Sequence, residues 1–248
     1  MVESREIYET LLDLCRKDKR GRSLDVDEFN RVAKMVDKRV YAHYYSNFEQ
    51  TLDSSDALGQ FKVTNYQVDL TSGVGALPSD YYNLIGSPRY TDGSDIRKVD
   101  VVTNLEYTSR QSDYLTRPTA KDPIMLIGGL DSSDNKEVRV LPATITPIRV
   151  DYLKESSTPY LDYYIDDTTY EYTFLDGGGV VVSMPSGNTY RDGTQGAANV
   201  TSVTVNFDWS TDDIPLLLSI FVQVLGLQLE DHMLIEVGNA EELKNTSR

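Results

Sequence analysis

Apolar side chains recur at helical spacing through the first 50 residues. Ile7, Leu11 and Leu14 share one face of a first predicted helix. A second helix is predicted to begin at Asp25, which can form a capping box with Glu28. Its apolar face extends over about six turns through Phe29, Val32, Ala33, Val36, Val40, Tyr44 and Phe48. We expect a helix pair or the start of a bundle here.

The pattern changes to short β-prone runs between residues 52 and 208. The runs predicted as strands are 61–70, 98–103, 124–127, 137–141, 145–153, 170–175, 180–184 and 200–207. In the last run, strict alternation places Val203, Val205 and Phe207 on one face. Residues 176–179 are predicted to be a hairpin turn and residues 186–199 a long loop. This spacing favours hairpins in an antiparallel sheet over βαβ units.

A strongly apolar helix is predicted after Trp209. Ser210 and Asp213 supply capping groups, Pro215 suits a first turn, and Gly226 can end the helix. A weaker helical segment follows at 230–244. The fold class expected is therefore α+β, in three parts. These parts are a helical assembly region at 1–50, a β-rich domain at 51–208, and a C-terminal helix with a docking tail at 209–248.

Charge is distributed unevenly along the 248 residues, which carry 39 acidic and 24 basic side chains and a net charge of −15. Residues 1–50 hold ten of each sign, so the whole excess lies after them. It is densest at 151–213, with 11 acidic and two basic residues. This excess disfavours a protein that holds nucleic acid by neutralising phosphates. It is typical either of a solubilising surface or of an acidic face, for which the candidates are Asp162, Asp166, Asp167, Glu171 and Asp176.

The residues that commonly carry catalysis are sparse. The chain has one cysteine, Cys15, and two histidines, His43 and His232, and it lacks nucleophile-elbow, Walker and His-Glu-x-x-His motifs. The Asp-rich segment 131–137 lacks the glycine and distal glutamate of a calcium loop, so it is interpreted as a turn. We therefore predict no enzyme activity, no catalytic residue, no bound metal and no cofactor. The absence of a signal-peptide core or of an apolar run long enough for a bilayer predicts no membrane partner.

Tyrosine is over-represented, with 17 residues against six Phe and one Trp. Such rings suit a subunit interface, an ordinary sheet surface, or stacking on sugars. We select seven residues as candidates for a subunit or partner interface, on the predicted helices and at Trp209. They are Phe29, Val36, Tyr44, Trp209, Leu217, Phe221 and Leu225.

The order of several segments resembles a known family of virion proteins. These segments are Leu77-Pro-Ser-Asp-Tyr-Tyr82, Val99–Tyr107 with the linker 110–120, Val138-Arg-Val-Leu-Pro142 and Ile148–Lys154, followed by the apolar C-terminal helix. The arrangement is similar to the head–tail connector (adaptor or neck ring) proteins of short-tailed double-stranded DNA phages, especially the crAss-like group. The resemblance covers roughly residues 5–240. It departs from the family at 162–199, which is longer and more acidic and is interpreted as an insertion.

The resemblance implies a structural protein in the neck of a virion, assembled in the host cytoplasm. It implies a homo-oligomeric ring of twelve copies below the portal protein. The ring would contact the portal and adjacent tail or ring proteins and line the exit channel, through which double-stranded DNA passes without tight binding. Two alternatives stay open. One is a carbohydrate- or receptor-binding β module using the tyrosines, Trp209 and the loop 186–199, and the other is a glycoside hydrolase using an acid pair such as Asp166 and Asp167.

Overall fold

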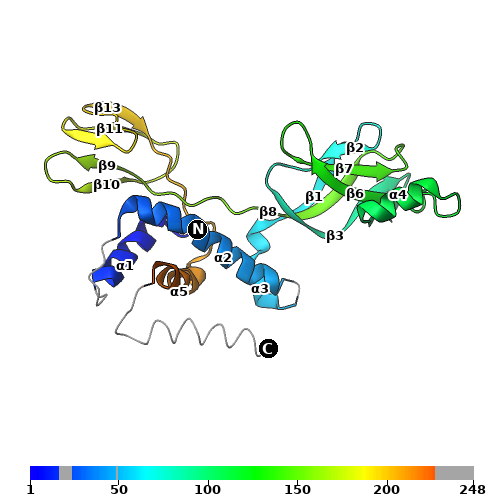
Figure 1. Ribbon diagram of the computed structural model, residues 1–248, viewed down its shortest axis with the longest axis horizontal. Coiled ribbons are helices and arrows are strands. Elements are labelled where there is room, and N and C mark those ends of the chain that lie inside the picture. The colour runs from blue at the N-terminus through cyan, green and yellow to red at the C-terminus, as the bar shows by residue number, and fades with distance from the viewer. Residues whose placement is uncertain (17–23, 49, 227–248) are drawn as a thin grey trace. The chain divides into compact units, whose positions relative to one another are not determined.

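The computed structural model describes residues 1–16, 24–48 and 50–226 (Figure 1). It has helices at the N-terminus, a central antiparallel β-rich region and a helix after it, which confirms the predicted α+β class. The weaker helix predicted at 230–244 lies outside the described residues.

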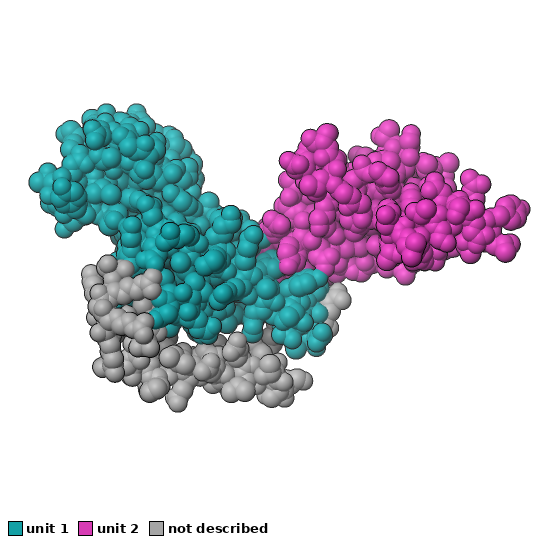
Figure 2. Space-filling model, viewed as in Figure 1, with its two compact units in different colours: residues 1–57, 156–248 teal, residues 58–155 magenta. Residues whose placement is uncertain are grey.

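Two compact units divide the chain differently from the three parts expected. Unit 1 is formed by residues 1–57 together with 156–248, and unit 2 by residues 58–155 (Figure 2). The acidic segment after residue 156 therefore belongs with the helices and not with the rest of the β-rich region. Long-range hydrogen bonds explain this division. The Asn30 side chain, for example, donates to the Leu161 carbonyl at 2.9 Å and accepts from the Leu161 amide at 2.8 Å.

Three helices of unit 1 follow the predicted apolar pattern closely: α1 (Ser4–Arg16), α2 (Val26–Ser46) and α5 (Ile214–Leu225), the last preceded by the 3₁₀ turn η2 (Thr211–Asp213). The short helix α3 (Leu52–Ala57) was not predicted and lies where the β-rich region was expected to begin. A capping box between Ser210 and Asp213 opens the η2–α5 segment, and Gly226 closes it at a left-handed φ of 66°. The rings of Phe29 in α2 and Phe221 in α5 stack with centroids 5.6 Å apart. The predicted apolar faces thus form the core of this unit.

The start of α2 agrees with the prediction, but its capping contact does not. Asp25 is the N-cap residue with an extended backbone, yet its side chain makes no cap hydrogen bond. Its Oδ1 instead accepts the Tyr172 hydroxyl at 2.8 Å. The tertiary contact has replaced the local one that the sequence pattern suggested.

Five short strands of unit 1 lie in residues 158–208, which we call the β lobe. β9 (Asp162–Asp166) lies between β10 (Tyr172–Leu175) and β12 (Asn188–Tyr190), while β11 (Val181–Met184) pairs with β13 (Ala198–Thr201). All these pairs are antiparallel. The expectation of one long loop at 186–199 is therefore wrong, because that segment contains β12 and the start of β13.

The alternating run 200–207 is also not one strand. β13 ends at Thr201, and Val203 is 42% exposed whereas Phe207 is fully buried. Further along, Val205 forms an isolated bridge with Tyr160 and Phe207 forms one with Val2. The run fails to continue in the sheet because the Val203 amide donates to the Asp162 carboxylate and not to a neighbouring strand.

Unit 2 consists of two four-stranded sheets. One has the order β1-β8-β3-β4 and the other β2-β7-β6-β5. The strands are β1 (Lys62–Val68), β2 (Val74–Ala76), β3 (Tyr81–Asp92), β4 (Asp95–Lys98), β5 (Asp100–Val101), β6 (Ile124–Leu130), β7 (Lys136–Leu141) and β8 (Ile148–Lys154). Pairing is antiparallel except between β5 and β6. Alternate residues such as Ile148 and Val150 of β8 and Val138 and Val140 of β7 meet in one core.

Two short helical segments complete unit 2. The 3₁₀ turn η1 (Gly59–Phe61) leads into β1, and α4 (Asn104–Ser112) lies between β5 and β6. The side chain of Thr103 caps α4 by accepting the Glu106 amide at 3.4 Å. None of the residues of α4 is buried. This helix was not predicted, because it has no apolar face from which it could be recognised.

Candidate functional site

Six of the seven side chains expected at a partner interface lie in the core of unit 1. Each is at most 3% exposed, namely Phe29, Val36, Trp209, Leu217, Phe221 and Leu225. The seventh, Tyr44, is half-buried and donates its hydroxyl to Oδ1 of Asp213 at 2.5 Å. The expected interface role is therefore corrected to a core role, since α2 and α5 cover each other's apolar faces. A partner must contact other side chains.

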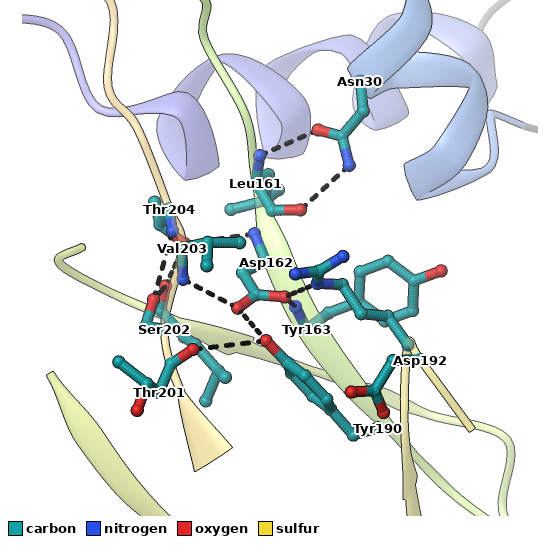
Figure 3. Close-up of polar contacts among 12 residues, drawn as sticks. Asn30, Leu161, Asp162, Tyr163, Tyr190, Asp192, Thr201, Ser202, Val203 and Thr204 are labelled. Carbon is teal, nitrogen blue, oxygen red and sulfur yellow. Dashed lines mark hydrogen bonds and ion pairs between the residues drawn. The ribbon is translucent and has the colours of Figure 1, made fainter. Parts of the chain in front are cut away.

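Asp162, expected on an acidic outer face, is fully buried instead. Four donors surround its carboxylate (Figure 3). Oδ2 accepts the Tyr190 hydroxyl at 2.6 Å and the Val203 amide at 2.9 Å. Oδ1 accepts Nε of Arg191 at 2.7 Å and the Tyr163 amide at 3.0 Å. A buried carboxylate with this many donors holds strands together and is not available to a ligand.

The only basic residue of the β lobe, Arg191, is used in this cluster. Its guanidinium carbon lies 5.3 Å from the ring centroid of Tyr160 and 5.2 Å from that of Tyr190. Burial lowers the pKa of Arg191, but its contacts with Tyr190, Tyr160 and Asp162 outweigh this and raise the pKa overall. Burial, together with the bond to Asp162, raises the pKa of the Tyr190 hydroxyl. The positive charge of the lobe is thus neutralised internally.

The other four acidic candidates lie at or near the surface of the β lobe. Asp167, Glu171 and Asp176 are exposed, and Asp166 is half-buried. Backbone amides of Thr169 and Thr168, each 2.8 Å from Oδ1 of Asp166, lower the pKa of this carboxyl. Asp176 makes a loose contact of 3.3 Å with Arg5. The β lobe therefore presents negative charge that it does not neutralise itself.

Two tyrosines connect the β lobe to the start of α2. The Tyr163 hydroxyl donates to Oδ1 of Asp27 at 2.9 Å, next to the Tyr172–Asp25 bond. Burial, followed by the bond to Asp25, raises the pKa of Tyr172 to about 12. Burial and the bond to Asp27 likewise raise the pKa of Tyr163. Part of the tyrosine surplus thus has an internal role.

Two features that motivated a carbohydrate-binding module differ from what was expected. Trp209 is fully buried, and its indole Nε1 donates to Oδ1 of Asp37 at 2.7 Å, so its ring cannot stack on a sugar. The expected loop 186–199 is not one continuous loop, because it contains β12 and the start of β13, with residues 191–197 between them.

A basic face on unit 2 was not identified from the sequence. In the pairing of β3 with β8, Arg89 lies directly opposite Arg149, and like charges in such a pair repel. Asp151, on the same face of β8, neutralises Arg89 through contacts of 2.9 and 3.1 Å with Nη2. The guanidinium of Arg149 has no hydrogen-bond or ion-pair partner among residues 1–16, 24–48 and 50–226. An uncompensated cation therefore lies on this face.

A cavity of ≈ 290 Å³ opens beside these two arginines. It is lined by Asn65, Arg89, Tyr90, Thr91, Ile96 and Arg149. Ile96 is 74% exposed and Tyr90 only 6%. The cavity therefore combines positive charge with an aromatic ring and an accessible aliphatic side chain. The sequence shows that Arg149 and Asp151 are two residues apart and so share a strand face. It does not show the register of β3 against β8, which places Arg149 opposite Arg89.

The remaining candidates from the sequence are the side chains that could bind a metal ion. In the part of the chain that the structure describes, no group of three or more His, Cys, Asp or Glu side chains could hold a metal ion. Cys15 is buried, and Oδ1 of Asp131 accepts the amides of Ser133 and Asn135, as in a turn. Over the same described ranges, no helix is long and apolar enough to cross a membrane.

Neither a protein-family model nor a curated protein matches this chain. The arrangement of its own residues is therefore the basis on which a function is proposed.

Proposed function

We propose that the chain is a non-enzymatic structural protein of a phage virion, which forms a head–tail connector ring below the portal. The ring joins capsid to tail and surrounds the passing DNA. The order of the chain's segments, which resembles that of such connectors, supports this assignment. The observation that carries it is the charge of the β lobe, whose single basic residue is bonded internally to Asp162 while Asp167, Glu171 and Asp176 stay exposed.

This charge arrangement suits a surface past which DNA must move. The β lobe holds seven acidic residues and one basic residue, whereas unit 2 is nearly balanced with 13 acidic and 11 basic residues. Carboxylates repel phosphates over about 8–10 Å at physiological ionic strength. Lys or Arg at the same positions would release counterions from DNA and bind it. An acidic lobe therefore guides a duplex without holding it.

Imaging of assembled particles tests the proposal most directly. We expect cryo-electron microscopy of the virion to locate this chain in the neck, and light scattering of the purified chain mixed with portal protein to detect a joint complex. A chain that stays monomeric and never joins the portal would refute the connector assignment.

DNA binding offers an independent test of the acidic lobe. We expect the purified wild-type chain to leave a duplex of random sequence unshifted in a gel assay at 0.15 M salt. Tight retention of the duplex under these conditions would contradict the proposed role of the lobe. The same chain after substitution of Asp167, Glu171 and Asp176 by Lys serves as the positive control.

A further inference from the structure

The turn between β9 and β10 presents the opposite chemistry to the cavity beside Arg149. Asp167 and Glu171 are exposed at this turn, and neither has an ion-pair partner among the described residues. Between them, Tyr170 is 77% exposed and has a left-handed backbone with φ of 58°. A bulky side chain at a left-handed φ is a backbone outlier, and such outliers are enriched at functional surfaces.

The turn is rigid enough to act as a preformed ligand. Oδ1 of Asp166 accepts the amides of Thr168 and Thr169, and the Tyr170 amide donates to the Asp166 carbonyl at 2.8 Å. The Asp167 amide donates to the Gly187 carbonyl at 2.9 Å, which joins the turn to the residue before β12. Because its backbone is already fixed, the turn loses little conformational entropy on binding.

We propose that the turn 166–171 of one copy docks into the Arg149 cavity of a second copy. The carboxylates of Asp167 and Glu171 neutralise the guanidinium of Arg149, and the Tyr170 ring covers Ile96 and the arginine plane. This proposal rests on the proposed function in so far as that function requires copies of the chain to assemble. It adds the surfaces through which they meet.

The symmetry of such a contact agrees with a ring. Turn and cavity are different surfaces in different units, so each copy can give its turn to one neighbour and receive the turn of another. Contacts of this heterologous kind close into rings or extend as filaments. A single turn buries less area than a stable pair of proteins needs, so the contact fixes register alongside others, and salt should weaken it.

Charge reversal in complementary variants tests the contact. Arg149→Glu reverses the charge of the cavity, and Asp167→Lys with Glu171→Lys reverses the charge of the turn. We expect each variant to self-associate at least about tenfold more weakly than wild type in sedimentation velocity. This corresponds to about 1.4 kcal/mol. An equimolar mixture of the two variants should associate again, because the acidic turn of the first fits the Arg149 cavity of the second, and the Lys turn of the second meets the Glu cavity of the first.

A chain that carries all three substitutions provides the decisive arm, because its Lys turn faces a Glu cavity. We expect it to regain association. Arg139→Glu in β7, whose exposed guanidinium pairs with Glu137, makes the same charge change on the other sheet and should associate as wild type does. The proposal would be overturned if Arg149→Glu associated as strongly as wild type. It would also be overturned if wild type stayed monomeric at every concentration.

Crosslinking supplies a measurement that does not depend on affinity. Thr168→Cys in the turn and Thr91→Cys in the cavity lining, placed in one chain, should form disulfides between copies, since both positions belong to the proposed contact. A lack of crosslinked species would count against the contact. If wild type retained duplex DNA and Arg149→Glu did not, the cavity would be a phosphate site and the docking proposal would fail.

The two proposals can fail separately. Docking variants that associate as wild type does, in a chain that still joins the portal, would remove this contact and leave the connector intact. A chain that associates through turn and cavity but never joins the portal would remove the connector assignment and leave this contact intact.

Discussion

The indole Nε1 of Trp209 donates a 2.7 Å hydrogen bond to Oδ1 of Asp37, and both side chains are buried, at 0% and 3% exposure. The Ser156 hydroxyl donates to the same oxygen at 3.1 Å. The bond joins the segment before α5 to the middle of α2. It satisfies the indole but keeps a carboxyl group away from water, which penalises the ionised form.

We therefore predict that Asp37 makes stability fall as the pH rises. Burial raises the pKa of Asp37 to about 6. The hydrogen bonds from Trp209 and Ser156 lower the pKa, but their effect is smaller than that of burial. Because the folded state binds the proton more tightly than the unfolded state, this contribution is complete below about pH 4 and is lost as pH rises through about 6. Asp37→Asn cannot ionise and should gain up to about 3 kcal/mol over wild type between pH 4 and 7.

Urea unfolding followed by the fluorescence of Trp209, the only tryptophan, checks this prediction in unit 1. The quantity to compare is the difference in free energy of unfolding between variant and wild type at each pH. Parallel curves for the two proteins would show that Asp37 keeps an ordinary pKa.

Substitution of Asp162 should be among the most damaging changes in the β lobe. In Asp162→Asn the new amide faces the Tyr190 hydroxyl and the Val203 amide, so donors meet donors, and Arg191 loses its ion-pair partner. Breaking a buried pair on one side costs about 3–5 kcal/mol. We expect a loss of this order in urea unfolding. Glu171→Gln, an exposed change of the same chemistry in the same lobe, should leave the midpoint in place.

The parts of the fold that depend on local signals could be predicted from the sequence. The helices α1, α2 and α5 were recognised because their apolar side chains recur at helical spacing and capping residues stand close to them in the sequence. The strand β12 was missed because Gly187 and its neighbours resemble a loop. It is a strand only because β9, distant in sequence, pairs with it. The interruption of 200–207 has the same origin, in the bond from the Val203 amide to Asp162.

The candidate site was predicted less well, for a related reason. Asp162 was grouped with exposed acids because strand alternation does not reveal its partner, Arg191, 29 residues away. One signal was present: in an acidic segment with so few bases, the lone arginine is the natural partner for a carboxylate in a strand. The opposition of Arg89 and Arg149 is a consequence of register and could not be predicted from either strand alone.

Two glycines of unit 2 provide a matched pair for packing. A Cβ on Gly75 in β2 would lie 2.7 Å from the Asp69 carbonyl oxygen and 2.8 Å from Cδ2 of Leu70, whereas one on Gly129 in β6 meets nothing within 4 Å. We expect Gly75→Ala to destabilise unit 2 by about 1–3 kcal/mol through overpacking. Gly129→Ala should be neutral or slightly stabilising, because it restricts the unfolded chain.

Hydrogen exchange separates these two outcomes. Amides of β7, which pairs with β2, should exchange faster in Gly75→Ala than in wild type and no faster in Gly129→Ala. Equal protection in all three proteins would mean that the strand shifts to accommodate the methyl group.

Substitution of Phe221 distinguishes its core role from the interface role that the sequence predicted for it. Its ring stacks on Phe29 and meets Phe207 edge-on at 6.1 Å, with no exposed surface. Phe221→Ala should therefore cost about 3–5 kcal/mol of unfolding free energy, and Leu105→Ala, at a leucine 82% exposed on α4, should cost little. Phe221→Leu should fold and associate as wild type does, since no partner reaches the ring. Weaker association by folded Phe221→Leu would mean instead that α5 separates from α2 when copies assemble.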